Sequence, residues 1–180
     1  MTQTHTEARP TTARHTRVTS PLGDVVLVAR EAALVGAYFD GQRYLPEAWT
    51  FGPRVDPGAD PVLGLAAEQL AEYFAGERRA FDLPLAPRGD AFAQRVWALL
   101  CAIPYGATTT YGALAEQVGG RGLAQAVGQS VGHNPISVIV PCHRVLGSDG
   151  SLTGYAGGLD RKRALLALEE PAEVTATRLF

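Results

Sequence analysis

Apolar and polar residues follow two different patterns in the first half of the chain. Two apolar runs, Val25–Ala29 and Leu34–Phe39, flank a short polar break, and this arrangement predicts a β-hairpin. A stretch rich in Gly and Pro follows, which is typical of a loop. Between residues 60 and 79, apolar side chains recur at helical spacing, at Leu63, Ala66, Leu70 and Phe74. We therefore expect a hairpin and then one helix, which ends near Gly76.

A second set of helical patterns begins at Asp90, a good N-cap residue for the apolar stripe of residues 90–103. Residues 108–120 and 121–134 predict two shorter helices joined by a glycine turn, which is typical of a helix-turn-helix. The second of these helices carries small residues at Ala124, Ala126, Gly128 and Ser130. Small side chains suit a helix that lies in a DNA groove, but they equally suit tight packing in a core.

The end of the chain predicts a buried strand over residues 135–140, a glycine-rich loop over 147–160 and a closing helix over 161–170. The glycines of the loop, Gly154, Gly157 and Gly158, allow a positive φ and a close approach to a planar ligand. The alternative is an ordinary flexible loop.

A connector with several prolines places a domain boundary near residue 88. We expect a flexible polar tail over residues 1–17 and an α/β domain with a small sheet over residues 18–88. A mostly α-helical domain over residues 89–172 would then contain the helix-turn-helix and the candidate site.

Composition narrows the class of protein. The 180-residue chain is 46% hydrophobic, which is enough for a substantial core. No apolar run is long enough to span a membrane, and the N-terminus lacks the apolar stretch of a signal peptide. The two cysteines, Cys101 and Cys142, do not form a disulfide framework, and we expect Cys101 to be a buried residue of a helix. These features predict a cytoplasmic protein with no membrane partner.

Charge is distributed unevenly, although the net charge is only −2. Residues 1–19 carry a net charge of +2, residues 20–89 carry −4, and residues 90–170 are neutral. Within the last segment, residues 121–163 carry +3. This basic stretch permits binding to a polyanion, but an ordinary solvated surface is the commoner explanation.

Candidate chemistry is concentrated at Cys142 and His143. A thiolate is a nucleophile, and a neighbouring imidazole can take the thiol proton. A carboxylate on the other imidazole nitrogen would fix its tautomer, and Glu169 and Glu170 are both candidates. A buried structural thiol beside a surface imidazole is commoner than a catalytic pair, and a cysteine hydrolase is a third interpretation. We expect no metal here, because no second cysteine lies nearby in a metal-binding spacing.

The longer string NPISVIVPCHRVLGSDGSLTGYAGGLDRKRALLALE, residues 134–169, closely resembles the signature region of the O6-alkylguanine-DNA alkyltransferases, also called methylated-DNA–protein-cysteine methyltransferases. The PCHRV core is highly specific to that family. The resemblance continues through YGATTTYGALAEQVG, AVG and SPLG, so that it covers residues 18–170. It implies a DNA repair protein that moves an alkyl group from the O6 atom of guanine to its own cysteine, irreversibly and once per molecule.

The resemblance also implies a role for each residue of the candidate site. Cys142 would accept the alkyl group, His143 would activate it through a water, and Glu169 would orient His143. Asn134 would tie the recognition helix to the active-site turn. The flipped nucleotide would meet Tyr111, Val145, Tyr155, Ala156 and Gly157.

Double-stranded DNA is the implied partner, bound through its minor groove with the alkylated guanine flipped out of the duplex. The DNA contacts would come from Gln125, Arg121, Ala126, Gly128 and Ser130. Gln125 departs from the family pattern, which usually has an arginine there to fill the gap left by the flipped base. Arg121, one turn earlier, would then help through a phosphate.

We expect a monomer that needs no cofactor and holds no metal. Some relatives have a zinc site, but the N-terminal part of this chain has no cysteines, and His5 and His15 lie in the expected tail.

Two functions within the family remain open from the sequence. One is the transferase that reacts once, and the other is a non-catalytic alkyltransferase-like protein that binds the lesion without repairing it. Such relatives lack the cysteine, so Cys142 favours the transferase. Gln125 is the one feature that favours the binding protein.

Overall fold

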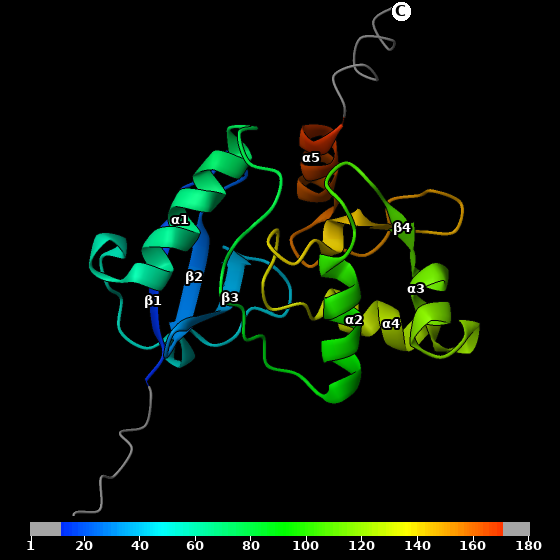
Figure 1. The fold of residues 1–180 in the computed structure, drawn as a ribbon, viewed down its shortest axis with the longest axis horizontal. Coiled ribbons are helices and arrows are strands. Elements are labelled where there is room, and N and C mark those ends of the chain that lie inside the picture. Colours follow the sequence, from blue (N-terminus) through cyan, green and yellow to red (C-terminus); the bar gives the residue numbers. More distant parts are fainter. Residues whose placement is uncertain (1–11, 171–180) are drawn as a thin grey trace, which may run out of the picture.

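Two lobes meet along a shared face in this computed structural model, which describes residues 12–170 (Figure 1). Within these residues, a three-stranded sheet and one α-helix form the first lobe, and four α-helices with a short strand pair form the second. The last helix, α5 (Leu159–Glu169), lies at the junction of the two. The expected fold class is confirmed: an α/β N-terminal part with a small sheet precedes a mostly α-helical C-terminal part.

Strands β1 (Arg14–Val18), β2 (Val25–Arg30) and β3 (Ala33–Phe39) form an antiparallel sheet in that order. The β2–β3 pair confirms the predicted hairpin. Strand β2 reads as a continuous apolar run because both of its faces are covered. One face joins the main core and the other a smaller cluster with Tyr38 and Phe51.

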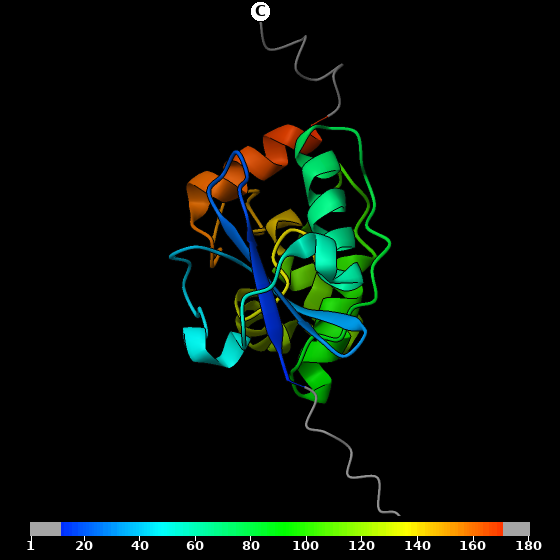
Figure 2. The same ribbon diagram turned by 90° about the vertical axis from the view of Figure 1, so that its left-hand side faces the viewer.

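Helix α1 (Pro61–Phe74) packs against this sheet (Figure 2). The Asp60 side chain caps its first turn by accepting hydrogen bonds from the N–H groups of Val62 and Leu63, at 3.1 and 3.0 Å. Gly76 follows the helix with a φ of 77°, so the predicted helix and its end are confirmed. The last turn of α1 carries Tyr73, which is fully buried and points to the second lobe.

Three helices build the body of the second lobe: α2 (Ala91–Cys101), α3 (Tyr111–Val118) and α4 (Ala124–Gly132). The Asp90 side chain caps α2, as predicted, and the Thr110 side chain caps α3. Helix α4 packs against both α2 and α3, and the 3-10 turn Arg121–Leu123 joins α3 to α4. The predicted pair of short helices is therefore confirmed.

Residues 135–140 do not form the predicted strand. They make a single parallel bridge with the edge of β3, in which the Ala37 N–H donates to the Pro135 carbonyl and the Ser137 N–H donates to the Ala37 carbonyl, both at 2.9 Å. The chain then turns through Val138, which has a φ of 72°. The segment is apolar because it is buried, and burial alone does not distinguish a strand from a buried turn.

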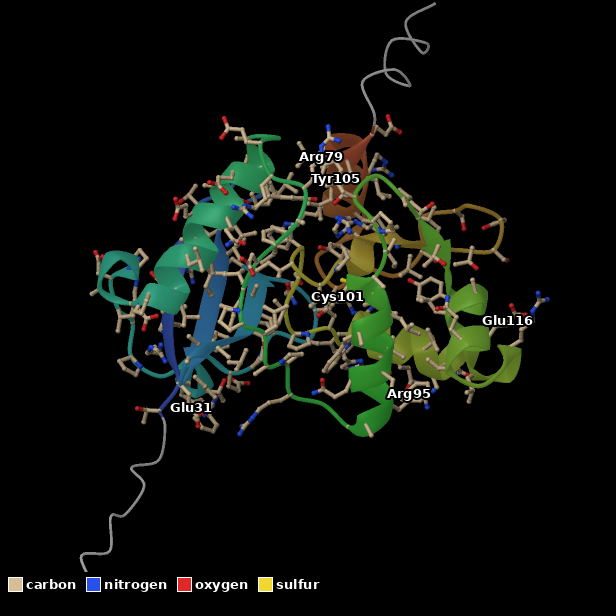
Figure 3. The ribbon with its side chains drawn as sticks, viewed as in Figure 1. Glu31, Arg79, Arg95, Cys101, Tyr105 and Glu116 are labelled. Carbon is tan, nitrogen blue, oxygen red and sulfur yellow. The ribbon has the colours of Figure 1, made fainter. Side chains whose placement is uncertain are left out.

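Two other expectations need correction. The flexible tail was expected over residues 1–17, but strand β1 begins at Arg14, so residues 14–17 belong to the sheet. Residues 1–11, which include His5, lie outside the described residues. His15 is a sheet residue whose Nδ1 lies 3.0 Å from the Gly52 carbonyl. Cys101, expected to be buried, is exposed, because it is the last residue of α2 and borders a cavity that Arg79 and Tyr105 also line (Figure 3).

A single hydrophobic core runs through both lobes. Its buried members come from the sheet, from α1, from α2 to α4 and from α5. The expected boundary near residue 88 lies in the connector between α1 and α2 and stays a prediction. Among residues 12–170, no helix is both long enough and apolar enough to cross a membrane.

Candidate active site

A tight turn carries the candidate nucleophile. Cys142 opens the 3-10 turn Cys142–Arg144, and its thiol is almost completely buried. Asn134 holds the approach to this turn: its Nδ2 donates to the Val140 carbonyl at 2.7 Å, and its Oδ1 accepts from the Ile136 N–H at 3.0 Å. The same Nδ2 lies 3.1 Å from the Cys142 Sγ. Asn134 therefore ties the end of α4 to the thiol.

His143 is fully buried beside the thiol and contacts a carboxylate. Its Nε2 lies 2.8 Å from Glu169 Oε1, so Glu169, rather than Glu170, is the carboxylate at the imidazole. A carboxylate accepts hydrogen bonds, so Nε2 carries the proton. The other nitrogen, Nδ1, is buried and has no protein partner. It is thus free to accept a proton.

Glu169 accepts hydrogen bonds from several segments at once. Arg144 donates through Nε and Nη2, each at 2.8 Å, and the Tyr73 hydroxyl donates to Oε1 at 2.7 Å. The Gly106 N–H donates to Oε2 at 3.3 Å. Burial alone would raise the pKa of Glu169, but the hydrogen bonds from His143, Arg144 and Tyr73 outweigh it and hold the pKa well below its ordinary value. The carboxylate is therefore charged at neutral pH.

Burial sets the resting protonation of the Cys142–His143 pair. It raises the pKa of the Cys142 thiol, against the opposing effects of the Asn134 hydrogen bond and the Lys162 charge. It also lowers the pKa of His143, against the opposing effect of Glu169. At neutral pH the pair therefore rests as a thiol and a neutral imidazole. The nucleophile forms only when the proton moves from sulfur to the imidazole.

Lys162 of α5 organises the glycine-rich loop beside the thiol. Its Nζ donates to the carbonyls of Val145 and Thr153, at 2.6 and 2.7 Å, and burial lowers its pKa to about 8. Val145 itself is fully buried in strand β5 (Val145–Leu146), which pairs with β4 (Thr109–Thr110). The buried ammonium therefore holds together the strand that follows the thiol and the loop that precedes α5.

Two of the three glycines of this loop have the expected positive φ: 45° at Gly154 and 91° at Gly158. At Gly157 the constraint is space, because a Cβ there would lie 2.6 Å from a ring carbon of Tyr155. These positions support a shaped loop rather than a merely flexible one.

A hollow of about 390 Å³ lies between α4, the start of α3 and this loop. Tyr111 borders it, and the Tyr111 hydroxyl donates to the carbonyls of Thr153 and Gly154 at 3.1 and 3.2 Å. Tyr155 and Ala156 form another wall. Cys142 does not line the hollow, but its charge when ionised would raise the pKa of both tyrosines, after the larger effect of burial.

Helix α4 presents one face to the hollow, through Gln125, Gly128, Gln129 and Gly132. Ala126 and Ser130 lie on another face, and the Ser130 carbonyl accepts a hydrogen bond from the Trp97 indole at 2.8 Å. Arg121 does not line the hollow either, since it forms an ion pair with Glu116 on the outer side of α3 (Figure 3). The structure therefore brings Gln125 and Gly128, but not the other three expected DNA contacts, to the hollow.

Sequence reasoning missed contributions from the first lobe. Of the described residues that line the hollow, Arg43 is the one arginine or lysine. Its backbone N–H donates to the Ala156 carbonyl at 2.9 Å. The Tyr44 ring stacks on His133 with 4.0 Å between ring centroids. Neither residue belongs to a recognisable motif, because both follow β3 in a loop that only the tertiary fold brings to α4.

Two family models match the chain. The ribonuclease-like domain of 6-O-methylguanine DNA methyltransferase matches residues 13–87, and the DNA binding domain of 6-O-methylguanine DNA methyltransferase matches residues 91–171. Together they include every residue of the candidate site.

Named relatives cover most of the chain. A methylated-DNA–protein-cysteine methyltransferase of Mycolicibacterium paratuberculosis is 50% identical over 165 residues, which span 91% of this chain and 96% of the relative. A protein of the same name from Methanosarcina acetivorans is 43% identical and covers 83% of this chain and 94% of its own.

Solved structures are similar over nearly their whole length. The crystal structure of Mycobacterium tuberculosis O6-methylguanine methyltransferase has a TM-score of 0.78 and 44% identity, and it covers 92% of this chain and 99% of that protein. A structure of the M. tuberculosis protein in complex with DNA has the same TM-score at 43% identity, with 91% and 99% coverage.

Replacing Glu169 by Gln is expected to lower the free energy of unfolding at pH 7 by about 3–5 kcal/mol, because the buried Arg144 loses its counter-charge. Folding lowers the pKa of Glu169, so the wild type has this stabilisation above the ordinary carboxyl pKa and loses it as the pH falls towards the folded pKa. The deficit of Glu169→Gln should therefore shrink by about 1.4 kcal/mol per pH unit below about pH 4. Urea denaturation at several pH values measures it.

Glu68→Gln is the matched control, since Glu68 is exposed on α1. It should change the free energy of unfolding by less than about 0.5 kcal/mol. A deficit of Glu169→Gln that stays constant down to pH 3 would contradict a charged, paired carboxylate.

Proposed function

Because the chain belongs to the 6-O-methylguanine DNA methyltransferase family, we propose that it repairs DNA by moving an alkyl group from the O6 atom of guanine to its own Cys142. Relatives that are 44–50% identical are named methylated-DNA–protein-cysteine methyltransferases, and this is the activity of the chain. DNA is its partner.

The observation that carries the proposal is the buried Cys142 next to His143, whose Nε2 is held by the charged carboxylate of Glu169. A buried thiol of ordinary structural use needs no such arrangement. The hollow bordered by Tyr111, Tyr155 and Ala156 provides the adjoining space for a planar base.

The reaction begins when the Cys142 proton moves to His143 Nδ1, through a water that bridges the two groups. The thiolate attacks the alkyl carbon, the carbon–sulfur bond forms, and the bond from that carbon to O6 of guanine breaks. The proton that left the thiol is the one that the departing guanine needs to become neutral. Glu169 does not take the proton; its negative charge stabilises the imidazolium that forms in between.

One molecule repairs one base under this scheme. The product is a thioether, which is not a leaving group for water, and none of the described groups around Cys142 is placed to reverse the transfer. The transferase is therefore consumed by its reaction.

Access to the O6 atom requires the guanine to leave the duplex, because the thiol is buried and cannot enter a base stack. We place α4 in the minor groove, with the face formed by Gln125 and Gly128 towards the hollow that receives the base. Gly128 suits this position, because its small size leaves the Tyr111 ring accessible. We expect one protein monomer for each lesion.

Charge at this face comes from an unexpected place. Gln125 brings no charge, and Arg121 is engaged with Glu116. Arg43 reaches the hollow from the first lobe, so we assign to it, rather than to Arg121, the contact with a DNA phosphate beside the flipped nucleotide.

A lesion-binding protein without transferase activity is the weaker alternative. It would need neither a thiol nor the imidazole–carboxylate pair behind it. This chain has all three: His143 follows Cys142 in the sequence, and its imidazole contacts Glu169. Relatives of 44–50% identity carry the transferase name.

Cys142 should be the alkyl acceptor. After the protein is mixed with duplex DNA that contains O6-methylguanine, intact-mass and peptide mass spectrometry should find one added methyl group, on Cys142 and not on the exposed Cys101. Cys142→Ala should gain no methyl group and still bind the DNA. A methyl group on Cys101, or none on the wild type, would overturn the proposed reaction.

His143 and Glu169 should act as a unit, since the carboxylate works only through the imidazole. His143→Ala and Glu169→Ala should each slow transfer by about a hundredfold or more, and the double variant should be little slower than either. The measurement is the second-order rate of methyl transfer for each variant. Glu170→Ala is the control. If it slows transfer as much as Glu169→Ala does, the role of Glu169 is wrongly assigned.

Gln125→Arg should speed repair of duplex DNA by several-fold and tighten binding, because an arginine adds a charge where a base has left the stack. Its reaction with free O6-methylguanine should stay unchanged, since no base needs flipping. Equal changes in both substrates would show that position 125 shapes the chemical site itself.

Arg43→Ala should weaken binding to duplex DNA and reduce its salt dependence by about one phosphate contact. Arg88→Ala is the control and should change neither, because Arg88 is exposed on the same lobe and does not line this hollow.

A further inference from the structure

Tyr73 crosses from the first lobe into the centre of the candidate site. It lies in the last turn of α1, 96 residues before Glu169, and its hydroxyl donates to Glu169 Oε1 at 2.7 Å. The residue is fully buried. Burial raises the pKa of this phenol, and the nearby carboxylate raises it further, so the hydroxyl keeps its proton and donates at neutral pH.

The acceptor of this hydrogen bond is the oxygen that holds the imidazole. Glu169 Oε1 receives Tyr73, His143 Nε2 and Arg144 Nη2, at 2.7, 2.8 and 2.8 Å. Donors that share one oxygen compete for its negative charge. Each bond from Tyr73 or Arg144 therefore weakens the hold of the carboxylate on a protonated His143.

We propose that Tyr73 is a positioning residue that sets the basicity of His143 through Glu169, so that the first lobe takes part in activating the nucleophile. This inference rests on the proposed function for its consequence in catalysis, but its physical content is a hydrogen bond that can be tested in the resting protein. Tyr73 touches neither the thiol nor the base.

A neighbouring tyrosine allows the role to be separated from packing. The rings of Tyr73 and Tyr105 meet edge to face, with 6.1 Å between centroids. The Tyr105 hydroxyl donates to the Leu168 carbonyl at 2.9 Å, one residue before Glu169, and leaves the carboxylate alone. Tyr105 thus stabilises the same end of α5 by a backbone contact (Figure 3).

The other charged groups around His143 keep their charge below about pH 7, since even Lys162, whose pKa is lowered to about 8, is protonated there. Arg144 is paired with Glu169, and Lys162 of α5 donates to backbone carbonyls. Cys142 is the remaining titratable neighbour. Arg79 lies over the ring of Tyr105. Removing the Tyr73 hydroxyl changes none of these charges. It leaves Oε1 with one donor fewer, which strengthens its hydrogen bond to the imidazolium and raises the pKa of His143.

The sign of the effect on rate follows. The imidazole must be neutral to accept the thiol proton, so transfer slows as the pH falls through the pKa of His143. In Tyr73→Phe this acid limb should lie roughly half to one pH unit higher than in the wild type. The rate on the plateau above it should change by less than about threefold, because His143 and Glu169 are still in place.

The experiment compares the full-length wild type with Tyr73→Phe and Tyr105→Phe. NMR titration of the His143 imidazole gives its pKa without any reaction, and the pH profile of transfer from free O6-methylguanine gives the acid limb. We expect both to rise in Tyr73→Phe and neither in Tyr105→Phe. A wild type that transfers no methyl group would reject the proposed function, whereas the NMR titration would still decide the role of Tyr73.

Unchanged pKa and acid limb in a folded Tyr73→Phe would overturn the proposal, as would an equal shift in Tyr105→Phe, which would show that packing at the end of α5 is responsible. If Tyr73→Phe does not fold, 3-fluorotyrosine placed at position 73 serves instead. Its more acidic hydroxyl is a stronger donor and should move the pKa of His143 and the acid limb to lower pH. A shift to higher pH, or no shift, would contradict the inference.

Discussion

The buried carboxylate of Glu169 is the constraint on which the arrangement of this protein depends. An ionised group in the interior is costly unless hydrogen-bond donors surround it. Here the donors come from α1, from the turn after α2 and from the turn that carries the thiol. Satisfying one anion therefore fixes these three segments relative to α5, which carries Glu169. The two lobes share one hydrophobic core around it.

Local patterns in the sequence predicted most of the elements. The hairpin, α1, α2, the short helix pair and α5 follow from apolar periodicity and from caps such as Asp90 and Thr110, because these signals act within a few residues. The strand prediction for residues 135–140 was wrong for the same reason: the Ile and Val residues favour a strand locally. Asn134 overrides that preference by bonding both ends of the segment, which brings Val138 to a positive φ.

The candidate site was predictable only in part. The motif identified Cys142 and His143, and helical phase could have chosen between the two carboxylates, because Lys162, Leu165 and Glu169 share the buried face of α5. Tyr73 and Arg43 gave no such signal. Tyr73 has the spacing of an ordinary core residue of α1, and Arg43 lies in an exposed loop. Their partners are fixed by how the lobes meet, which is information that no short stretch of sequence contains.

The position of α5 at the end of the described chain has a consequence for biosynthesis. The thiol, the imidazole and the whole first lobe leave the ribosome before Glu169 does. Until α5 docks, His143 lacks its carboxylate and Tyr73 lacks its acceptor. A nascent or interrupted chain thus holds its single-use sulfur in an unactivated state. The thiol becomes reactive only after α5 has packed against both lobes and Glu169 contacts His143.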